Sequence, residues 1–346
     1  MTADDHPGDR SLRYLPRADV IAACEHVDEV AVLRRALSLH AVGRSILPAE
    51  AYLGWSTSDG RPARSLALPG ALWDDDPAIG VKIINSSLGN ADLGIARAQG
   101  LTLLFDRETA RPAALMEAAY ISALRTAAYT ALSADLLAAR VETVAVIGCG
   151  TLGETHALLL SERLPSAGFL LHDLDPDRCA RLAGRLRERG ARAGCVPDAE
   201  AAVRPADVVV TTTTVTSGYL EYAWLREGAL IAHVSLDDVL PEVVERADLL
   251  VVDDWELVRS DTRRVLGRMH QAGLVVGPAA EAAAPDACRK VDAVLGSVLT
   301  GRHPGRTDDR QIVLSNPFGM GILDVAIAAE VWKTARALGL GIELPV

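Results

Sequence analysis

The first 140 residues show two periodicities of apolar positions, and their order predicts a mixed set of strands and helices. Short β-branched runs favour strands, whereas apolar residues spaced by three and four favour helices. We predict a short strand ending at Pro16, a helical segment over 18–43, a turn-rich loop with one short strand over 54–77, strands over 80–86 and 100–106, a turn over 107–112 and a long helix over 115–139.

A different pattern begins at residue 141, where short apolar strands alternate with helices. We predict strands over 141–150, 168–173, 207–214, 228–236, 248–254 and 311–319, with helices over 151–164, 175–190 and 321–339. Strands that alternate with helices at this spacing predict a parallel, doubly wound sheet of the Rossmann kind.

The length of 346 residues is too great for one simple core, so we expect two domains. The helix over 321–339 has its own apolar face, and we expect it to return and pack on the first domain. We therefore predict an α/β protein with a discontinuous α+β domain, residues 1–130 completed by 316–346, beside a Rossmann domain of residues 131–315.

Composition and charge exclude several classes of function. The net charge of −11 gives no electrostatic footprint for nucleic acid. No apolar run reaches the roughly 18 residues that span a bilayer, and the acidic start lacks a secretory signal. The five scattered cysteines form no metal-ligand spacing, so we expect no metal and free thiols in a reducing cytoplasm.

A GxGxxG motif, formed by Gly148, Gly150 and Gly153, directly follows the strand over 141–150 and opens a helix. In a dinucleotide-binding turn the three glycines allow the tight turn, the approach of the pyrophosphate and close helix–strand packing. The N–H groups of the first helical turn, which contains Thr151 and Leu152, would then face the phosphates. The motif predicts a dinucleotide site.

The choice of dinucleotide depends on Asp173, which ends the second Rossmann strand twenty residues after Gly153. A carboxylate there accepts hydrogen bonds from the adenine ribose and repels a 2′-phosphate, so we predict NAD. The alternative is that Asp173 caps the following helix. The threonine run over 211–215 follows the fourth strand, and we assign Thr212 and Thr213 to the cofactor, although threonine is also common in strands.

Lys82 is unusual because it lies within an apolar strand, and only three of the 35 basic residues are lysines. Arg125 lies among small residues on a predicted helix, so it would also be partly desolvated. Two buried cations require an anion. A substrate carboxylate would satisfy both, and the alternative is that protein acids do so, with Glu117 and Asp106 as the nearby candidates.

The chain resembles the ornithine cyclodeaminase/μ-crystallin family over nearly its whole length. The resemblance rests on KIINSSLGNADLGIARAQGLTLLFDRETARPAALMEAAYISALRTAA, on VIGCGTLG and on NPFGMGILDVAIA. The text YLEYAWLREGALIAHVSLDDV, ADLLVVDDWE and LTGRHPGRTDDRQIVLSNPFGMGI is similar to the branch of N-(2-amino-2-carboxyethyl)-L-glutamate dehydrogenases, which make 2,3-diaminopropionate for siderophores and peptide antibiotics.

The resemblance implies a homodimer, an N-terminal substrate-binding and dimerisation domain, and a Rossmann domain that binds NAD. It implies that Lys82 and Arg125 hold the carboxylate of a small amino-acid-derived substrate. It also implies a catalytic acid/base in VSLDDV, at Asp237 or Asp238, of which we prefer Asp237. The family usually carries a further cation near ILPAEAYLGW, where this chain has Glu50 instead. Arg44 before this stretch and Arg64 after it are the candidate replacements, and we choose Arg64 as a substrate-binding residue.

The expected reaction removes hydride from a carbon that bears an amine and a carboxylate. A base must first take the proton of the amine, and Asp237, Asp238 or a neutral Lys82 could do so. We predict NAD-dependent oxidative hydrolysis to 2-oxoglutarate and L-2,3-diaminopropionate. The alternatives are cyclodeamination of ornithine or lysine, a ketimine reductase or amino-acid dehydrogenase activity, and a dinucleotide-binding protein without turnover.

Overall fold

The computed structural model describes residues 11–278 and 288–345 and divides the chain into two compact units. Unit 1 comprises residues 1–125 and 320–346, and unit 2 comprises residues 126–319. The predicted boundaries, 130/131 and 315/316, differ from these by four or five residues. Unit 1 is discontinuous because the C-terminal helix belongs to it.

Unit 1 is a mixed, mainly antiparallel sheet of eight strands with helices against it. The strand order is β18-β1-β7-β6-β5-β4-β2, and β3 pairs with β4. The elements are β1 (Ser11–Leu15), α1 (Arg17–Cys24), α2 (Glu29–Ala41), β2 (Ser45–Ile46), β3 (Ala51–Ser56), β4 (Pro62–Leu72), β5 (Ala78–Ser87), the 3-10 helix η1 (Leu88–Leu93), β6 (Ala98–Phe105), β7 (Pro112–Glu117), the start of α3 (Ala119–Leu137), α11 (Gly321–Leu338) and β18 (Ile342–Pro345).

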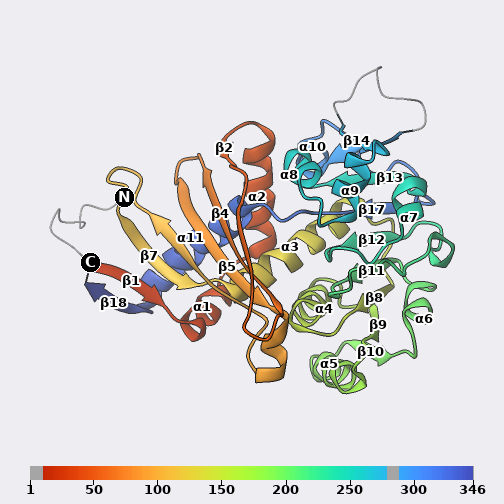
Figure 1. Ribbon diagram of the computed structural model, residues 1–346, viewed down its shortest axis with the longest axis horizontal. Helices are drawn as coiled ribbons and strands as arrows, with labels where there is room; N and C mark the ends of the chain where they lie inside the picture. The colour runs from red at the N-terminus through yellow and green to blue at the C-terminus, as the bar shows by residue number, and fades with distance from the viewer. Residues whose placement is uncertain (1–10, 279–287, 346) are drawn as a thin grey trace. The chain divides into compact units, whose positions relative to one another are not determined.

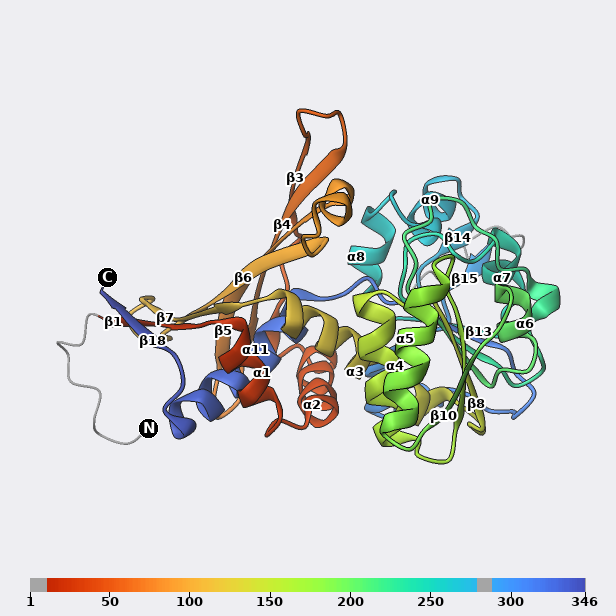
Figure 2. The ribbon, with the colours of Figure 1, turned by 90° about the horizontal axis from the view of Figure 1, so that it is seen from below.

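The C-terminal helix α11 forms the core of unit 1. It packs against β4, β5 and β6, and α1 and α2 pack against it. Its buried positions are almost all apolar, from Ile322 to Ala335, so it covers one face of the sheet. Figure 1 shows the helix running along the sheet, and Figure 2 shows the β3–β4 hairpin extending beyond the helices.

The prediction of a loop over 54–77 is wrong, because β4 is a strand of 11 residues there. Proline and glycine had indicated turns. In the structure Pro62 opens the strand, and Pro69 lies between the stretch of β4 paired with β3 and the stretch paired with β2. On the side of β2 and β3 no strand residue lies opposite Pro69, so its missing N–H loses no ladder hydrogen bond on that side.

Two predicted helices also need correction. The segment over 18–43 is two helices, because the carboxylate of Asp28 accepts a hydrogen bond from Ala31 N and begins α2 anew. The helix over 115–139 begins only at Ala119, since residues 112–117 form β7. The carboxylate of Glu117 caps it by accepting hydrogen bonds from the N–H groups of Ala119 and Tyr120.

Unit 2 is a parallel sheet of eight strands in the order β10-β9-β8-β11-β12-β17-β13-β16. Its elements are the rest of α3, β8 (Thr143–Ile147), α4 (Thr151–Arg163), β9 (Gly168–His172), α5 (Pro176–Glu188), β10 (Arg192–Cys195), α6 (Ala199–Val203), β11 (Val208–Thr211), the 3-10 helix η2 (Tyr222–Trp224), β12 (Leu230–His233), α7 (Pro241–Arg246), β13 (Leu249–Val252), α8 (Trp255–Ser260), α9 (Val265–Gln271), β14 (Val275–Val276), β15 (Arg289–Lys290), β16 (Ala293–Val294), α10 (Leu295–Leu299) and β17 (Val313–Ser315).

The order of the strands in unit 2 confirms the predicted Rossmann fold. The central strands β11, β12 and β13 are buried throughout, as expected of strands covered on both faces. Helices α4 and α5 lie on one face of the sheet, and α6 and α7 lie on the other (Figure 1). The strands after β8 are added first on one side of it, as β9 and β10, and then on the other, as β11 and β12. Ligands of such sheets bind at the carboxyl ends of the strands at this switch point.

The expectation of free thiols is wrong for two of the five cysteines. Cys179 and Cys195 form a disulfide, with 6.0 Å between their Cα atoms. The first turns of α5 lie beside β10, and this neighbourhood cannot be deduced from a separation of 16 residues in the sequence. Cys24, Cys149 and Cys288 are free thiols. In the described parts of the chain, no helix has both the length and the apolar character to cross a membrane.

Candidate active site

The three glycines after β8 have different surroundings, and each fits the task expected of a dinucleotide loop. Gly148 has a φ of +94°, a conformation that side chains rarely adopt. A Cβ on Gly153 would lie 1.8 Å from Gly148 O, so the helix approaches the strand closely here. A Cβ on Gly150 would meet nothing within 4 Å, which leaves room above the loop for a ligand. The loop therefore fits a pyrophosphate.

Asp173 is fixed against this loop and does not cap the next helix. Its Oδ2 accepts a hydrogen bond from Cys149 N at 2.6 Å, and its Oδ1 accepts one from Asp175 N at 2.8 Å. The cap of α5 is Asp175, which accepts from the backbone N–H groups of the first helical turn. The structure thus excludes the capping alternative for Asp173 and leaves its carboxylate beside the loop.

The two threonines assigned to the cofactor have partners within unit 2. Thr212 Oγ1 donates its hydrogen bond to backbone oxygens below the glycine loop, with Gly148 O 2.8 Å away. Thr213 Oγ1 donates to Asp238 Oδ1 at 2.8 Å. The first hydroxyl supports the loop and the second supports a carboxylate, so direct contact of either with a cofactor stays a prediction.

Asp238 is a fully buried carboxylate whose two oxygens differ: one accepts two hydrogen bonds, and the other is bare, with none from the described residues. Its Oδ1 accepts hydrogen bonds from Thr213 Oγ1 and from Tyr219 OH, the latter at 2.9 Å. Its Oδ2 is buried and has no hydrogen-bond partner within residues 11–278 and 288–345. Burial raises the pKa of Asp238, with its neighbour Asp237 contributing in the same direction, while hydroxyl donors oppose the shift. A buried carboxylate with a raised pKa and a bare oxygen is a candidate for proton transfer.

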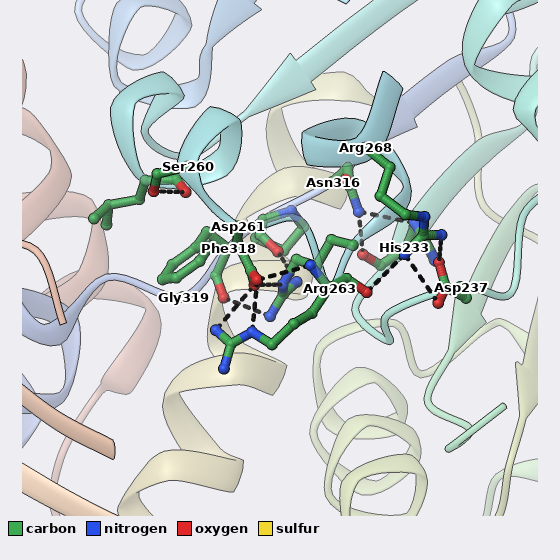
Figure 3. A network of polar contacts seen from close by, with 12 residues as sticks. His233, Asp237, Ser260, Asp261, Arg263, Arg268, Asn316, Phe318 and Gly319 are labelled. Carbon is green, nitrogen blue, oxygen red and sulfur yellow. Dashed lines mark hydrogen bonds and ion pairs between the residues drawn. The ribbon is translucent and has the colours of Figure 1, made fainter. Parts of the chain in front are cut away.

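Asp237 has a different environment, although it is the adjacent residue. Its side chain forms an ion pair with Arg268, whose side chain is 46% exposed (Figure 3). Both oxygens of Asp237 accept hydrogen bonds from this guanidinium, so neither is bare. The two candidates that sequence reasoning left open are therefore distinguishable by their partners.

A buried histidine fixes the backbone of the turn that carries Asp237 and Asp238. His233, at the end of β12, accepts the N–H of Asp238 on Nε2 at 3.2 Å, and its Nδ1 lies 2.8 Å from Asn316 Nδ2 (Figure 3). Burial, reinforced by Arg264, lowers the pKa of His233 to about 3, so the ring is neutral and serves as an acceptor. The turn that carries Asp238 is thus anchored to the strand.

In unit 1, Lys82 and Arg125 converge on one protein carboxylate, that of Asp324. Lys82 Nζ lies 2.8 Å from Asp324 Oδ2, and Arg125 Nε lies 3.2 Å from Asp324 Oδ1. Lys82 also donates to Ser122 Oγ at 3.2 Å. Asp324 is fully buried and Lys82 is only 2% exposed. The cations do meet, and a carboxylate of the C-terminal helix lies between them.

Close packing of α11 on the sheet makes this contact possible. A Cβ on Gly70 of β4 would lie 2.8 Å from Ile322 Cγ2, and one on Gly321 would lie 2.9 Å from Leu68 O. Glycines on both the strand and the helix therefore allow the backbones to approach. Asp324, one turn along the helix, then reaches the buried amine of Lys82.

Burial is the main influence on the protonation of Lys82. It lowers the pKa of the amine to about 8; Arg125 adds to this effect, whereas Asp324 and Glu50 oppose it. A lysine with this pKa is mostly protonated at pH 7 and loses most of its charge as the pH rises above about 8.

The other predicted partners of the cations lie elsewhere in unit 1. Glu117 caps α3, and Asp106 accepts hydrogen bonds within its own turn, from Glu108 N and from Thr109. The alternative that a protein acid pairs with the two cations is thus correct in kind, but the acid is Asp324 and neither Glu117 nor Asp106. Arg64 donates to Ser86 Oγ at 3.2 Å and shares no hydrogen bond with the cation pair.

Sequence reasoning missed two residues of these clusters. Asp324 is the only charged residue in the buried run GILDVAIAA, which is the same kind of anomaly that identified Lys82. Tyr219, which donates to Asp238, gave no comparable signal because it lies in an irregular loop.

Comparison with known proteins agrees with this arrangement. The family model described as ornithine cyclodeaminase/mu-crystallin family matches residues 18–338. The N-((2S)-2-amino-2-carboxyethyl)-L-glutamate dehydrogenase of Staphylococcus aureus is 33% identical over 343 residues, which cover 97% of this chain and 98% of that protein. The alanine dehydrogenase of Archaeoglobus fulgidus is 28% identical, covering 89% of this chain and 90% of that one.

Two solved structures have the same fold over almost the whole chain. The crystal structure of CmnK is 41% identical, with a TM-score of 0.88 and coverage of 97% and 98% of the two chains. An archaeal alanine dehydrogenase dimer with bound NAD is 26% identical, with a TM-score of 0.82 and coverage of 96% and 99%. From the family match and these relatives, the chain belongs to the ornithine cyclodeaminase/mu-crystallin family.

Proposed function

We propose that this NAD-dependent oxidoreductase converts N-(2-amino-2-carboxyethyl)-L-glutamate to L-2,3-diaminopropionate and 2-oxoglutarate. The observation that carries the proposal is the convergence of Lys82 and Arg125 in unit 1. Two cations held side by side suit the carboxylate of an amino acid. The Staphylococcus aureus relative, similar over 97% of the chain, supports this particular substrate.

Arg125 has its two Nη atoms left to bind a substrate carboxylate. Its hydrogen bond to Asp324 uses Nε, and its two Nη atoms have no hydrogen-bond partner among the residues that the structure describes. The side chain is 12% exposed, compared with 2% for Lys82. Two parallel N–H groups of a guanidinium match the two oxygens of a carboxylate.

The glycine loop of unit 2 would hold NAD. The open space above Gly150 and the backbone N–H groups that begin α4 fit the pyrophosphate, and the carboxylate of Asp173 fits the adenine ribose. When bound, NAD would accept the hydride that oxidises the carbon–nitrogen bond of the substrate. A carboxylate at position 173 would repel the extra phosphate of NADP.

The residues of the chain then have separate tasks. Arg125 and Lys82 bind and orient the carboxylate on the carbon to be oxidised. Asp238 takes the proton of the substrate amine on its bare Oδ2, since an unprotonated nitrogen is required for oxidation. The same carboxylic acid can later return the proton to the departing nitrogen after water has added.

Arg64 is our candidate for a further carboxylate of this triacidic substrate. Strand pairing places it opposite Ser86 and places Lys82 opposite Leu68, so both cations lie on the same face of the sheet. Four positions along a strand correspond to roughly 13 Å between the backbones, and a long arginine side chain shortens that gap.

The first prediction is that purified protein mixed with NAD and N-(2-amino-2-carboxyethyl)-L-glutamate produces NADH and 2-oxoglutarate in equal amounts. Absorbance at the NADH maximum and an enzymatic assay for 2-oxoglutarate measure the two products. NADP should be a much poorer substrate because of Asp173.

Other outcomes would contradict the proposal and identify the alternative. Proline formed from ornithine without net NADH would indicate a cyclodeaminase. NADH consumption with a cyclic imine, or with an oxo acid and ammonia, would indicate a reductive enzyme. Tight NAD binding with no turnover of any of these compounds would indicate a binding protein.

We further propose a homodimer formed through unit 1. Residues alternate between the two faces of a strand, so the pairing of β3 to β6 places Leu53, Trp55, Ile83 and Leu101 on the face opposite Lys82. All four are exposed, by 64, 48, 42 and 41%. An apolar face of this kind suits contact with another protein surface, and the archaeal alanine dehydrogenase relative is a dimer.

The second prediction is that light scattering gives twice the mass of one chain for the wild type and a single-chain mass for Leu53→Glu/Ile83→Glu. Burying two unpaired carboxylates at an interface is unfavourable. Leu338→Glu, which changes an exposed leucine at the end of α11, is the control and should remain dimeric. A single-chain mass for the wild type would refute this part of the proposal.

A further inference from the structure

Asp324 bridges Lys82 and Arg125, and of the three side chains Arg125 is the most exposed, at 12%. One carboxylate oxygen accepts from Lys82 and the other from Arg125. The contact to Arg125 is made through Nε, on the edge of the guanidinium that faces the carboxylate. Because this contact uses Nε, the two donors at the far end of the guanidinium, one on each Nη, make no hydrogen bond to Asp324.

The three side chains in direct contact carry one uncompensated positive charge. Lys82 and Arg125 contribute two positive charges, and Asp324 neutralises one of them. A bound monocarboxylate would neutralise the other. Without Asp324, the two buried cations would face each other, which is unfavourable at this degree of burial.

We propose that Asp324 is a positioning residue for the substrate: it keeps Lys82 in its charged form and turns the outer edge of Arg125 toward the α-carboxylate. This inference rests on the proposed function, because the carboxylate it concerns is that of the amino-acid substrate. It assigns Lys82 to carboxylate binding and excludes it as the base that accepts the amine proton.

The charge of Lys82 depends on few neighbours. Asp324 on α11 and Glu50 before β3 raise its pKa, whereas burial and Arg125 on α3 lower it. Ser122, the other hydrogen-bond partner, does not titrate in this range. Of the groups that raise the pKa of Lys82, Asp324 has the largest effect. Without its carboxylate, the pKa of Lys82 should therefore fall below about 8.

The experiment compares variants that separate charge from size. Asp324→Asn keeps the shape and removes the charge, Asp324→Ser is a second neutral variant, and Asp324→Glu keeps the charge with one more methylene. Asp19→Asn is the matched control, because Asp19 holds Gly341 N in the same unit without contacting a cation. For each variant, kcat/KM for N-(2-amino-2-carboxyethyl)-L-glutamate is measured from pH 6 to 10, together with the Kd for NAD.

We expect the fall of kcat/KM at alkaline pH to move to lower pH by roughly one unit in the neutral variants and to stay near the wild-type position in Asp324→Glu and Asp19→Asn. At pH 8 the neutral variants should lose about tenfold or more in kcat/KM, mainly through KM, with the Kd for NAD changed less than about twofold. The substrate amine titrates equally in every variant and cannot cause a difference between them.

Three results would overturn the inference. The first is a fall of kcat/KM at the same alkaline pH in all variants. The second is a kcat/KM that rises through pH 8, which would indicate that neutral Lys82 is the base, and the third is that Asp324→Asn and Asp324→Ser do not fold. Failure of the proposed function is a separate result, because the wild type would then form no NADH from this substrate, whatever happens at position 324.

Discussion

Replacement of Arg125 by methionine is expected to lower kcat/KM for N-(2-amino-2-carboxyethyl)-L-glutamate by roughly a hundredfold or more. The variant loses the two-point contact of the outer guanidinium edge with the substrate carboxylate. A hydrogen bond to a charged group contributes about 1.5–3 kcal/mol, and about 1.4 kcal/mol corresponds to a factor of ten. Initial rates of NADH formation measure the effect, and calorimetric titration measures the affinity for NAD, which should stay within about twofold of the wild type.

Arg125→Lys distinguishes geometry from charge. A single ammonium cannot keep Asp324 and present two parallel donors outward, so the lysine variant should recover little activity. Arg35→Met is the control, because Arg35 belongs to surface ion pairs with Asp74 and Glu330 of the same unit. Full activity of Arg125→Lys, or an equal loss of NAD affinity in Arg125→Met, would show that the guanidinium has another role.

The Rossmann unit could be predicted from the sequence because its signals are local. Each strand is a short, continuous apolar run, and the glycines that follow β8 have fixed tasks within six residues of each other. Unit 1 was harder to predict, because the residues of β4 serve contacts far along the chain. In the sequence Gly70 indicates a turn. In the structure it lies within β4, where a side chain would collide with Ile322 of α11.

The cation pair shows the same limit for the candidate site. The sequence identified Lys82 and Arg125 as charges in apolar surroundings and required an anion for them. It also contained a carboxylate in an apolar run, Asp324, but 242 residues separate it from Lys82. Only the return of α11 to unit 1 brings them together. Unpaired charges of opposite sign in two apolar segments are thus a signal that could have predicted this contact.

The adjacent aspartates show what a sequence cannot distinguish. Asp237 and Asp238 belong to one turn, and a resemblance to a family allows a shift of one position. Their difference arises from long-range partners, since Arg268 comes from α9 and Tyr219 from the loop before η2. Physical reasoning on the structure therefore favours Asp238, whereas our sequence-based preference was Asp237.

Replacement of Asp238 by asparagine is accordingly expected to lower kcat by roughly 10²–10⁴-fold, the usual contribution of a general base. An amide has the same shape and can still accept from Thr213 and Tyr219, but it cannot take a proton. Single-turnover formation of NADH at saturating substrate measures the effect. Asp237→Asn should retain most of the activity, because it removes only an ion pair with an exposed arginine.

The pH dependence gives an independent test of the same assignment. A base acts in its unprotonated form, so kcat should rise as the pH increases through the pKa of Asp238, which burial holds above the usual value of an aspartate. Tyr219→Phe removes a donor that favours the charged form, so the pKa of Asp238 should increase further and the acidic limb should move to higher pH. Asp237→Asn removes a like charge and should move the limb slightly the other way. If Asp237→Asn lost as much activity as Asp238→Asn, or if Tyr219→Phe left the limb unmoved, the proton acceptor would be a different group.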